Sequence, residues 1–154
     1  MGIALKLKQY LDDQGIEYDV TEHRKTSSSE TTAEASHVSG DSLAKGVIVK
    51  REGDYLLVVV PASRSVALDE LGGWLKQPVT LAREDEIGEL FPDCDLGAVP
   101  PVGGAYGLKA AVDESLDRQE EIFFEGGDHR TLVRLSGAQF RHLMAKVPHE
   151  RFTA

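Results

Sequence analysis

The segment that most constrains this chain runs from Leu96 to Lys109 and reads Leu-Gly-Ala-Val-Pro-Pro-Val-Gly-Gly-Ala-Tyr-Gly-Leu-Lys. Its prolines fix φ and lack N–H donors, whereas its glycines let the backbone bend sharply and approach another molecule. The segment therefore predicts a stiff, apolar loop suited to the wall of a small-molecule pocket, with backbone groups as the polar contacts. A rigid crossover between strands, with no ligand, explains the same residues. The loop alone does not separate these interpretations.

Length and composition predict a single domain over residues 1–154 with a hydrophobic core that needs no disulfide or metal. Hydrophobic residues make up 41% of the chain and charged residues 28%, which is usual for globular proteins. No apolar run is long enough to cross a bilayer. The first ten residues lack the apolar stretch and cleavage site of a signal peptide, so we expect a cytoplasmic protein that does not contact membranes.

The single cysteine, Cys94, lies between Asp93 and Asp95. Two neighbouring carboxylates raise the pKa of a thiol, so we do not expect Cys94 to act as a nucleophile. Because no second cysteine is present to form a disulfide, we expect the protein in a reducing compartment. The formal net charge of −9 argues against a broad nucleic-acid surface, because nonspecific affinity for phosphates comes from clustered Lys and Arg. The acidic runs at 84–89 and 113–121 are interpreted as solvated faces, since no histidine accompanies them at metal-ligand spacing.

The order of periodic segments predicts the secondary structure. A helix ends at Gly15, a half-buried strand covers 16–21, and a short helix runs through 33–35. Two strands, 43–50 and 55–60, form a hairpin with its turn at 51–54. The expected elements that follow are a short helix at 68–75 interrupted by Gly72 and Gly73, a brief strand at 79–81, a helix at 83–90, strands at 110–112, 122–124 and 132–135, and a final helix capped by Ser136.

Short strands mix with short helices, and no regular βαβ alternation is present. This pattern favours an α+β fold with a mixed, curled sheet of six or seven strands, forming a partly closed barrel flanked by short helices.

Lys45 precedes the apolar run 47–49, at the start of a strand expected to be central. A partly buried lysine there supplies a point charge for a phosphate or an ester carbonyl, or it is a lysine that merely reaches solvent from a strand end. His129 follows Gly126, Gly127 and Asp128 and precedes Thr131, which predicts a loop histidine near the surface. It is either a plain loop residue or a hydrogen-bonding group at a pocket rim. No Gly-x-Ser-x-Gly, Walker or zinc pattern is present.

Three blocks together resemble the YbaK/prolyl-tRNA synthetase-associated domain family, which are aminoacyl-tRNA deacylases. The strand at 43–50 is similar to the family's lysine-bearing strand, the residues Gly97-Ala98-Val99-Pro100-Pro101 match its Gly-x-x-x-Pro loop, and the residues at 123–131 resemble its late hairpin. The resemblance covers nearly the whole chain and implies a YbaK-like fold.

The resemblance further implies a free-standing enzyme that hydrolyses the ester of a mischarged tRNA in trans, without a cofactor. It assigns Lys45 to the CCA end of the tRNA, Gly97 to Pro101 to the aminoacyl group, and His129 to the pocket. Gly103, Gly104 and Thr131 are further candidates for substrate binding, and an aminoacyl-tRNA synthetase or elongation factor is a candidate partner. Candidate local contacts for RNA are Lys50, Arg51, Arg64 and Arg130.

This chemistry needs no strong nucleophile, because an aminoacyl ester is already activated and the enzyme must place water and stabilise an oxyanion. Alanyl or cysteinyl esters of the proline tRNA are the substrates that the resemblance implies, with serine and threonine still open. Two alternatives remain: a noncatalytic module that binds tRNA or a synthetase, and a hydrolase of small esters. Salt-dependent affinity would favour RNA as the ligand.

Overall fold

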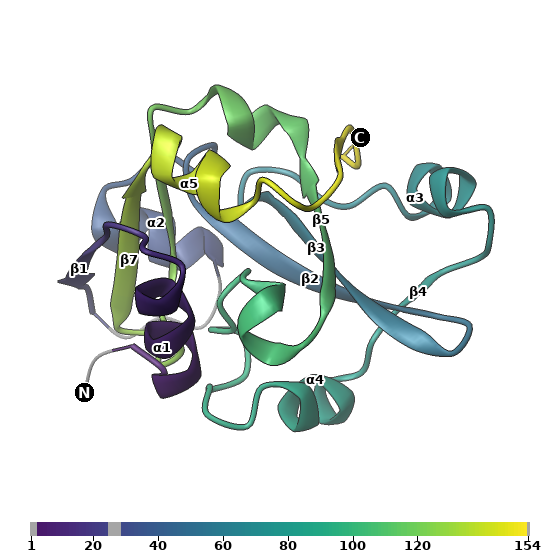
Figure 1. Ribbon diagram of the computed structural model, residues 1–154, viewed down its shortest axis with the longest axis horizontal. Coiled ribbons are helices and arrows are strands. Elements are labelled where there is room, and N and C mark those ends of the chain that lie inside the picture. Colours follow the sequence, from purple (N-terminus) through teal and green to yellow (C-terminus); the bar gives the residue numbers. More distant parts are fainter. Residues whose placement is uncertain (1–2, 25–28, 154) are drawn as a thin grey trace.

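The computed structural model describes residues 3–24 and 29–153, with side chains from Thr32 onward in the second range. Its helices and strands form a mixed α+β arrangement (Figure 1). The α-helices are α1 (Leu5–Asp13), α2 (Ser29–Ser36), α3 (Leu68–Leu75), α4 (Glu84–Leu90) and α5 (Gly137–Leu143), and two 3-10 helices are η1 (Gly103–Tyr106) and η2 (Glu114–Arg118). The strands are β1 (Asp19–Glu22), β2 (Ala44–Arg51), β3 (Asp54–Pro61), β4 (Thr80–Leu81), β5 (Lys109–Asp113), β6 (Glu121–Glu125), β7 (Thr131–Ser136) and β8 (His149–Glu150).

The strands form two sheets rather than one. The order is β1-β7-β6 in the smaller sheet and β4-β2-β3-β5-β8 in the larger one. A parallel bridge between Leu43 and Phe123 joins the start of β2 to β6, and the N–H of Phe123 donates to the carbonyl of Ser42 at 2.9 Å. The predicted α+β class is confirmed, whereas the partly closed barrel is not.

The β2–β3 hairpin is the longest paired unit, with a register from Ala44 opposite Pro61 to Arg51 opposite Asp54. Its alternation assigns each face of the larger sheet to a different core. Residues such as Ile48, Leu57 and Val59 face the main cluster, and Val49 and Val58 face a second cluster that α3 covers. The hairpin predicted from sequence is therefore confirmed.

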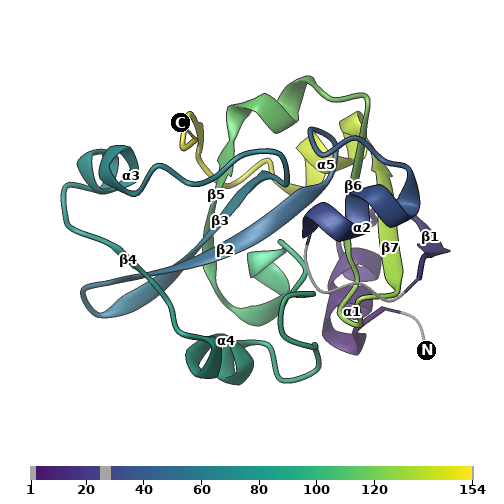
Figure 2. The same cartoon turned by 180° about the vertical axis from the view of Figure 1, so that it is seen from behind.

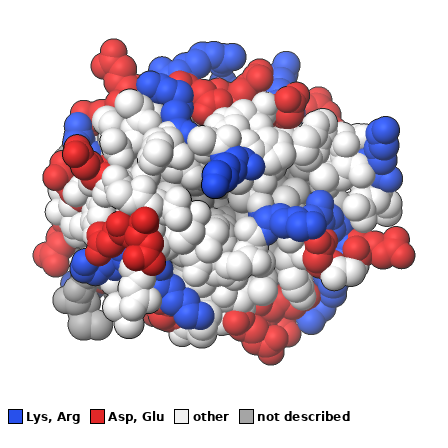
Figure 3. Space-filling model, viewed as in Figure 1, with Lys and Arg blue, Asp and Glu red and all other residues white. Residues whose placement is uncertain are grey.

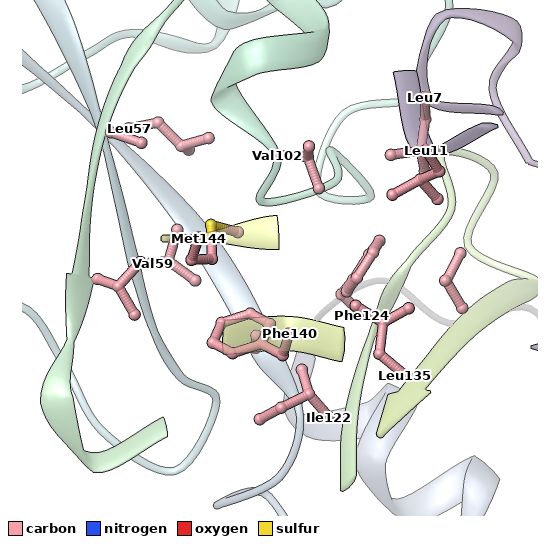
Figure 4. Close-up of a cluster of buried hydrophobic side chains, with 14 of the residues drawn as sticks. Leu7, Leu11, Leu57, Val59, Val102, Ile122, Phe124, Leu135, Phe140 and Met144 are labelled. Carbon is pink, nitrogen blue, oxygen red and sulfur yellow. The ribbon is translucent and has the colours of Figure 1, made fainter. Parts of the chain in front are cut away.

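The main core lies between the two sheets and is closed by α1 and α5. Figure 4 shows side chains from both sheets and both helices meeting in this layer. Full burial of residues such as Phe124 and Phe140 stabilises the fold by roughly 2 kcal/mol per side chain. Helix α2 packs on the outer side of the smaller sheet, where Ala33 contacts a cluster that includes Leu43 and Leu132 (Figure 2).

Several expectations are confirmed with shifted bounds, and others are wrong. Helix α1 is followed by Gly15 at φ 68°, as a C-terminal glycine requires, and Ser136 caps α5 by accepting from the N–H of Gln139. The first strand begins later than predicted and all its residues are exposed, including Val20. Helix α3 runs without interruption through its two glycines. The elements η1, η2 and β8 were not predicted.

The acidic run at 84–89 is not wholly solvated. Glu86 is buried, because its carboxylate accepts from the Tyr55 hydroxyl and from the backbone N–H of Arg83, and it pairs with Lys50 at 3.1 Å. These partners, of which the Tyr55 hydroxyl has the largest effect, lower the pKa of Glu86 to about 2. Asp113 in the other acidic run is also buried, where it accepts from the N–H of Phe152.

None of the helices in the described part of the chain combines the length and the apolar character that a membrane span needs.

Candidate active site

The start of β2 is where the two sheets meet, and it carries Lys45. The bridge between Leu43 and Phe123 brings β6 alongside this point, so that Glu125, two residues further along β6, comes near it. Lys45 is partly buried, as the sequence predicts. The topology thus brings together a cation and an acid that are 80 positions apart in the sequence.

The Gly/Pro segment packs against the same part of β2. A Cβ atom at Gly46 would lie 2.7 Å from Leu57 Cδ1 and 3.4 Å from Pro101 Cα, so the absence of a side chain at position 46 permits this close approach. The other end of the segment is tied to the β6–β7 turn, because the N–H of Asp95 donates to the carbonyl of Gly127 at 2.7 Å. The segment is held at both ends.

These elements enclose a small pocket of about 110 Å³. Among the described residues, Lys45 and Glu125 are the only charged ones in its lining, and the other described lining residues are apolar or glycine. The full lining set is Ala44, Lys45, Gly46, Ile48, Ile87, Gly97, Val99 and Glu125. Of the residues proposed from sequence, the structure brings Lys45, Gly97 and Val99 together here.

The other proposed residues lie elsewhere. Ala98, Pro100 and Pro101 are buried and do not line the small pocket. Gly103 and Gly104 line a different hollow, described below. The buried Thr131 donates its hydroxyl to Asp128 at 3.0 Å and reaches neither pocket. The glycine-rich segment is thus divided between two cavities.

Backbone donors in the segment are fewer than its length suggests. Prolines have no N–H, and the N–H of Ala98 already donates to the carbonyl of Asp95 at 3.1 Å. The N–H groups of Gly97 and Val99 donate to no acceptor among the described residues. These two pocket-lining residues therefore hold the donors available to a ligand.

Glu125 is the centre of a buried polar cluster behind the pocket. Its Oε1 lies 3.0 Å from His23 Nε2, and its Oε2 accepts from the Thr32 hydroxyl at 2.9 Å. The Nδ1 of His23 lies 2.6 Å from the carbonyl of Arg24, which can only accept, so Nδ1 carries a hydrogen. Both carboxylate oxygens therefore have one partner each and lone pairs to spare.

His129 is buried, with 7% of its surface exposed, so its predicted surface position is wrong. Its backbone is left-handed at φ 62°, and its Nε2 donates to the carbonyl of Leu96. Its Nδ1 lies 3.9 Å from Glu125 Oε2 and is buried without a hydrogen-bond partner among the described residues. His129 thus links the Gly/Pro segment to the neighbourhood of Glu125.

The turn that carries His129 is organised by Asp128. Its carboxylate accepts from the N–H groups of Arg130 and Thr131 at 2.9 and 2.8 Å. Although burial acts in the opposite direction, these hydrogen bonds hold the pKa of Asp128 below its usual value. The turn is therefore rigid, with its carboxylate ionised.

Sequence reasoning missed Glu125 and His23. The available signal was weak: Glu125 ends the apolar strand β6, at a position where buried carboxylates are uncommon unless they are paired. Its partners His23 and Thr32 lie 102 and 93 positions away in the sequence, so no local motif predicts these contacts.

Cys94 is not poised for chemistry. Burial is the main cause that raises the pKa of its thiol to about 12, and the charge of Asp93 adds to it. The upward direction of this shift is the one predicted from the two flanking acids. Among the described residues, no group of three or more His, Cys, Asp or Glu side chains is arranged to hold a metal ion.

A family model described as "Aminoacyl-tRNA editing domain" matches residues 23–143. The chain belongs to this family. The match includes both the lysine-bearing strand and the late turn, so the resemblance predicted from sequence is confirmed. No curated protein matches the chain by sequence.

Solved structures share the fold of this editing domain. One belongs to a study of "epitope backbone grafting by computational design"; it is 23% identical, has a TM-score of 0.86, and the alignment covers 98% of this chain and 97% of the other. Another, named as a "putative trans-editing enzyme for prolyl tRNA synthetase", is also 23% identical, with a TM-score of 0.84 and coverage of 97% and 95%. A signal transduction protein from Marinobacter aquaeolei VT8, also named as putative, is 16% identical with a TM-score of 0.78; the alignment covers 97% of this chain and 30% of that one. At these identities the likeness establishes the fold.

Proposed function

We propose that this chain, as a single domain, hydrolyses the ester bond of mischarged aminoacyl-tRNA in trans, in the small pocket at the start of β2. The observation that carries the proposal is that Lys45, Glu125, Gly97 and Val99 line one cavity in a chain of the editing-domain family, and that the N–H groups of Gly97 and Val99 donate to no described acceptor.

Each group has a distinct role in this proposal. Lys45 binds a phosphate of the CCA end as a point charge. The N–H groups of Gly97 and Val99 stabilise the oxyanion that forms when water attacks the ester carbonyl. Glu125 accepts a hydrogen bond from the α-ammonium group of the aminoacyl moiety, using lone pairs that His23 and Thr32 leave free. The 2′-hydroxyl of the terminal ribose assists the water.

The size of the pocket limits the acyl group. Liquid water occupies roughly 30 Å³ per molecule, so about 110 Å³ has room for roughly four water-sized groups. An alanyl group and, with little rearrangement, a cysteinyl or seryl group match this space, whereas the prolyl ring is larger. This supports alanyl or cysteinyl esters of the proline tRNA as the substrates.

Only the end of the tRNA is expected to enter the pocket. A chain of net charge −9 binds RNA locally, so a synthetase or an elongation factor that presents the aminoacyl-tRNA is a suitable partner. Such a role fits a cytoplasmic protein.

The test is the hydrolysis of a panel of aminoacyl-tRNAs, correct and mischarged, by the wild type, by Lys45→Ala and by Lys76→Ala. Lys76 is exposed and lies outside the small pocket, so it is the matched control. We expect selective turnover of a small acyl group that is lost in Lys45→Ala and retained in Lys76→Ala. If no panel member is turned over, deacylation is rejected. Binding without turnover would then favour a noncatalytic module, and turnover of free esters alone would favour a small-ester hydrolase.

A further inference from the structure

A second, larger hollow of about 570 Å³ is lined by residues of β5 and of the segment after α5, elements that lie in front in Figure 1. Its wall includes the outer edge of β5, the segment 142–148 after α5, the side chains of Trp74 and Leu75, and the backbone of Gly103 and Gly104. No described residue lines both this hollow and the small pocket. The Gly/Pro segment borders both, with residues 97 and 99 on one and residues 102–104 on the other.

The fold leaves this hollow open because β8 covers only the end of β5. Strand β8 pairs with Val112 and Asp113, whereas Lys109 to Ala111 pair only with β3 on their other side. The lining beside this uncovered edge is mostly apolar and includes Leu56, Met144 and Val147. A ligand with an apolar body would therefore gain free energy by burial there.

The charges of the lining all have one sign. The chain has 26 acidic residues, yet none of those that the structure describes lines the hollow, whereas Arg51, Lys109 and Lys146 do, together with His142. Figure 3 shows the face viewed in Figure 1: basic side chains lie at its centre and to its right on a largely uncharged surface, and acidic ones lie on the left, along the top and bottom, and beside the basic group on the right. A chain of net charge −9 thus presents a cationic concave surface.

Two of these cations are available to a ligand. Arg51 already donates to Asp54 through two hydrogen bonds, at 2.5 and 3.0 Å. Lys109 and Lys146 are exposed and form no ion pair with any described carboxylate. Lys109 lies on β5 and Lys146 lies after α5. The two ammonium groups can therefore reach an anionic group in the hollow from two different elements.

We propose that this hollow is a second ligand site, separate from the editing pocket, for a small amphipathic organic anion: an aromatic or aliphatic body with one carboxylate, sulfonate or phosphate. The apolar lining selects the body and the two lysines select the sign of the charge. The volume falls within the range of ordinary small-molecule sites. The inference does not depend on deacylase activity.

The chain contains its own reporter for this site. Trp74 is its only tryptophan, lines the hollow, and packs edge-on against Phe152 with ring centroids 5.3 Å apart. Anilinonaphthalene sulfonate is an amphipathic anion that accepts energy from tryptophan, and phenyl-naphthylamine is the same ring system without the sulfonate. Titration of the folded protein with each dye separates binding of the anion from binding of an apolar body.

We expect the sulfonate dye to saturate at one molecule per chain, with energy transfer from Trp74, and to bind more tightly than the neutral dye. The double variant Lys109→Gln/Lys146→Gln should weaken the sulfonate dye by about fivefold and leave the neutral dye unchanged. The matched control is Lys8→Gln/Arg118→Gln, which removes the same charge from exposed positions outside the hollow and should have little effect.

Further variants test the location. Trp74→Phe should abolish energy transfer while dye excited directly still titrates, and Lys45→Ala should leave dye binding unchanged. Equal affinity for both dyes, or no effect of the lysine pair beyond that of the control pair, would overturn charge selection. Displacement of the dye by an RNA hairpin with an acceptor-stem end, or loss of binding in Lys45→Ala, would overturn the separation from the editing pocket.

Discussion

Replacing Glu125 by alanine should destabilise the fold much more than replacing it by glutamine, and the hydrogens of its cluster show why. His23 Nδ1 carries a hydrogen, since it faces the carbonyl of Arg24. One further proton lies between His23 Nε2 and Glu125 Oε1, on one side or the other. With glutamine, the side-chain N–H donates to the bare Nε2 of a neutral His23, and the amide oxygen accepts from Thr32. Every group keeps a partner.

Alanine removes the acceptor of the Thr32 hydroxyl and the partner of His23 Nε2. An unsatisfied buried polar group costs about 1–3 kcal/mol. The His23 side chain is 1% exposed, so water does not readily replace the carboxylate. We therefore expect Glu125→Ala to lower the free energy of unfolding by about 3 kcal/mol, and Glu125→Gln to change it by about 1 kcal/mol or less.

Urea unfolding followed by far-ultraviolet circular dichroism measures both variants against the wild type. In the deacylation assay, Glu125→Gln should keep the fold and lose turnover, because a neutral amide binds an ammonium group less strongly than a carboxylate does. The reasoning is refuted if glutamine destabilises the chain as much as alanine does. Full deacylase activity in a stable Glu125→Gln variant would instead refute only the proposed contact with the ammonium group.

Three further outcomes are expected. Val99→Ala should enlarge the small pocket by the volume of two methyl groups, roughly 50 Å³. Hydrolysis of a larger acyl ester should then rise about tenfold relative to hydrolysis of the alanyl ester. If the ratio of these two rates in the aminoacyl-tRNA panel is unchanged, the pocket does not select the acyl group by size. The pKa of Glu86 is lowered from 4.5 to about 2, mainly by the hydrogen bond from the Tyr55 hydroxyl. The ionised carboxylate therefore stabilises the fold above pH 4.5, and this contribution is lost as the pH falls from 4.5 to about 2. Over this pH range the urea midpoint should fall less in Glu86→Gln than in the wild type. Cys94, whose pKa burial raises to about 12, should react with a disulfide reagent at neutral pH far more slowly than after unfolding, and equal rates would argue against its burial.

Local signals predicted much of the fold. The β2–β3 hairpin, the glycine after α1 and the Ser136 cap are each encoded within a few neighbouring residues, and each is confirmed. Strand β8 was missed because it is two residues long and exists only through its pairing with β5. The division into two sheets likewise depends on long-range register, which periodicity does not carry.

The residues of the candidate site also differ in whether local sequence or long-range packing determines their positions. Lys45, Gly97 and Val99 were recognisable because the resemblance lies in contiguous motifs. Glu125 and His23 were not, since their proximity arises only when β6 and the segment after β1 come together. His129 was expected at the surface from its polar turn, but its ring folds inward to the carbonyl of Leu96. A polar sequence around a residue describes its neighbours in the chain, and the packing of other segments decides its burial.

The Gly/Pro segment explains why both pockets can exist in so small a protein. A segment with ordinary side chains would fill the space on either side of it, whereas Gly46 lets Pro101 lie against β2, and Gly104 leaves room for Tyr10, whose hydroxyl would lie 2.3 Å from an added Cβ atom. The thin wall that results separates a pocket whose described lining has one cation and one anion from a hollow whose described charged residues are all cations. A substrate end with an ammonium group and a phosphate matches the first, and a ligand with a single negative charge matches the second. The same wall can therefore serve two ligands without a shared contact.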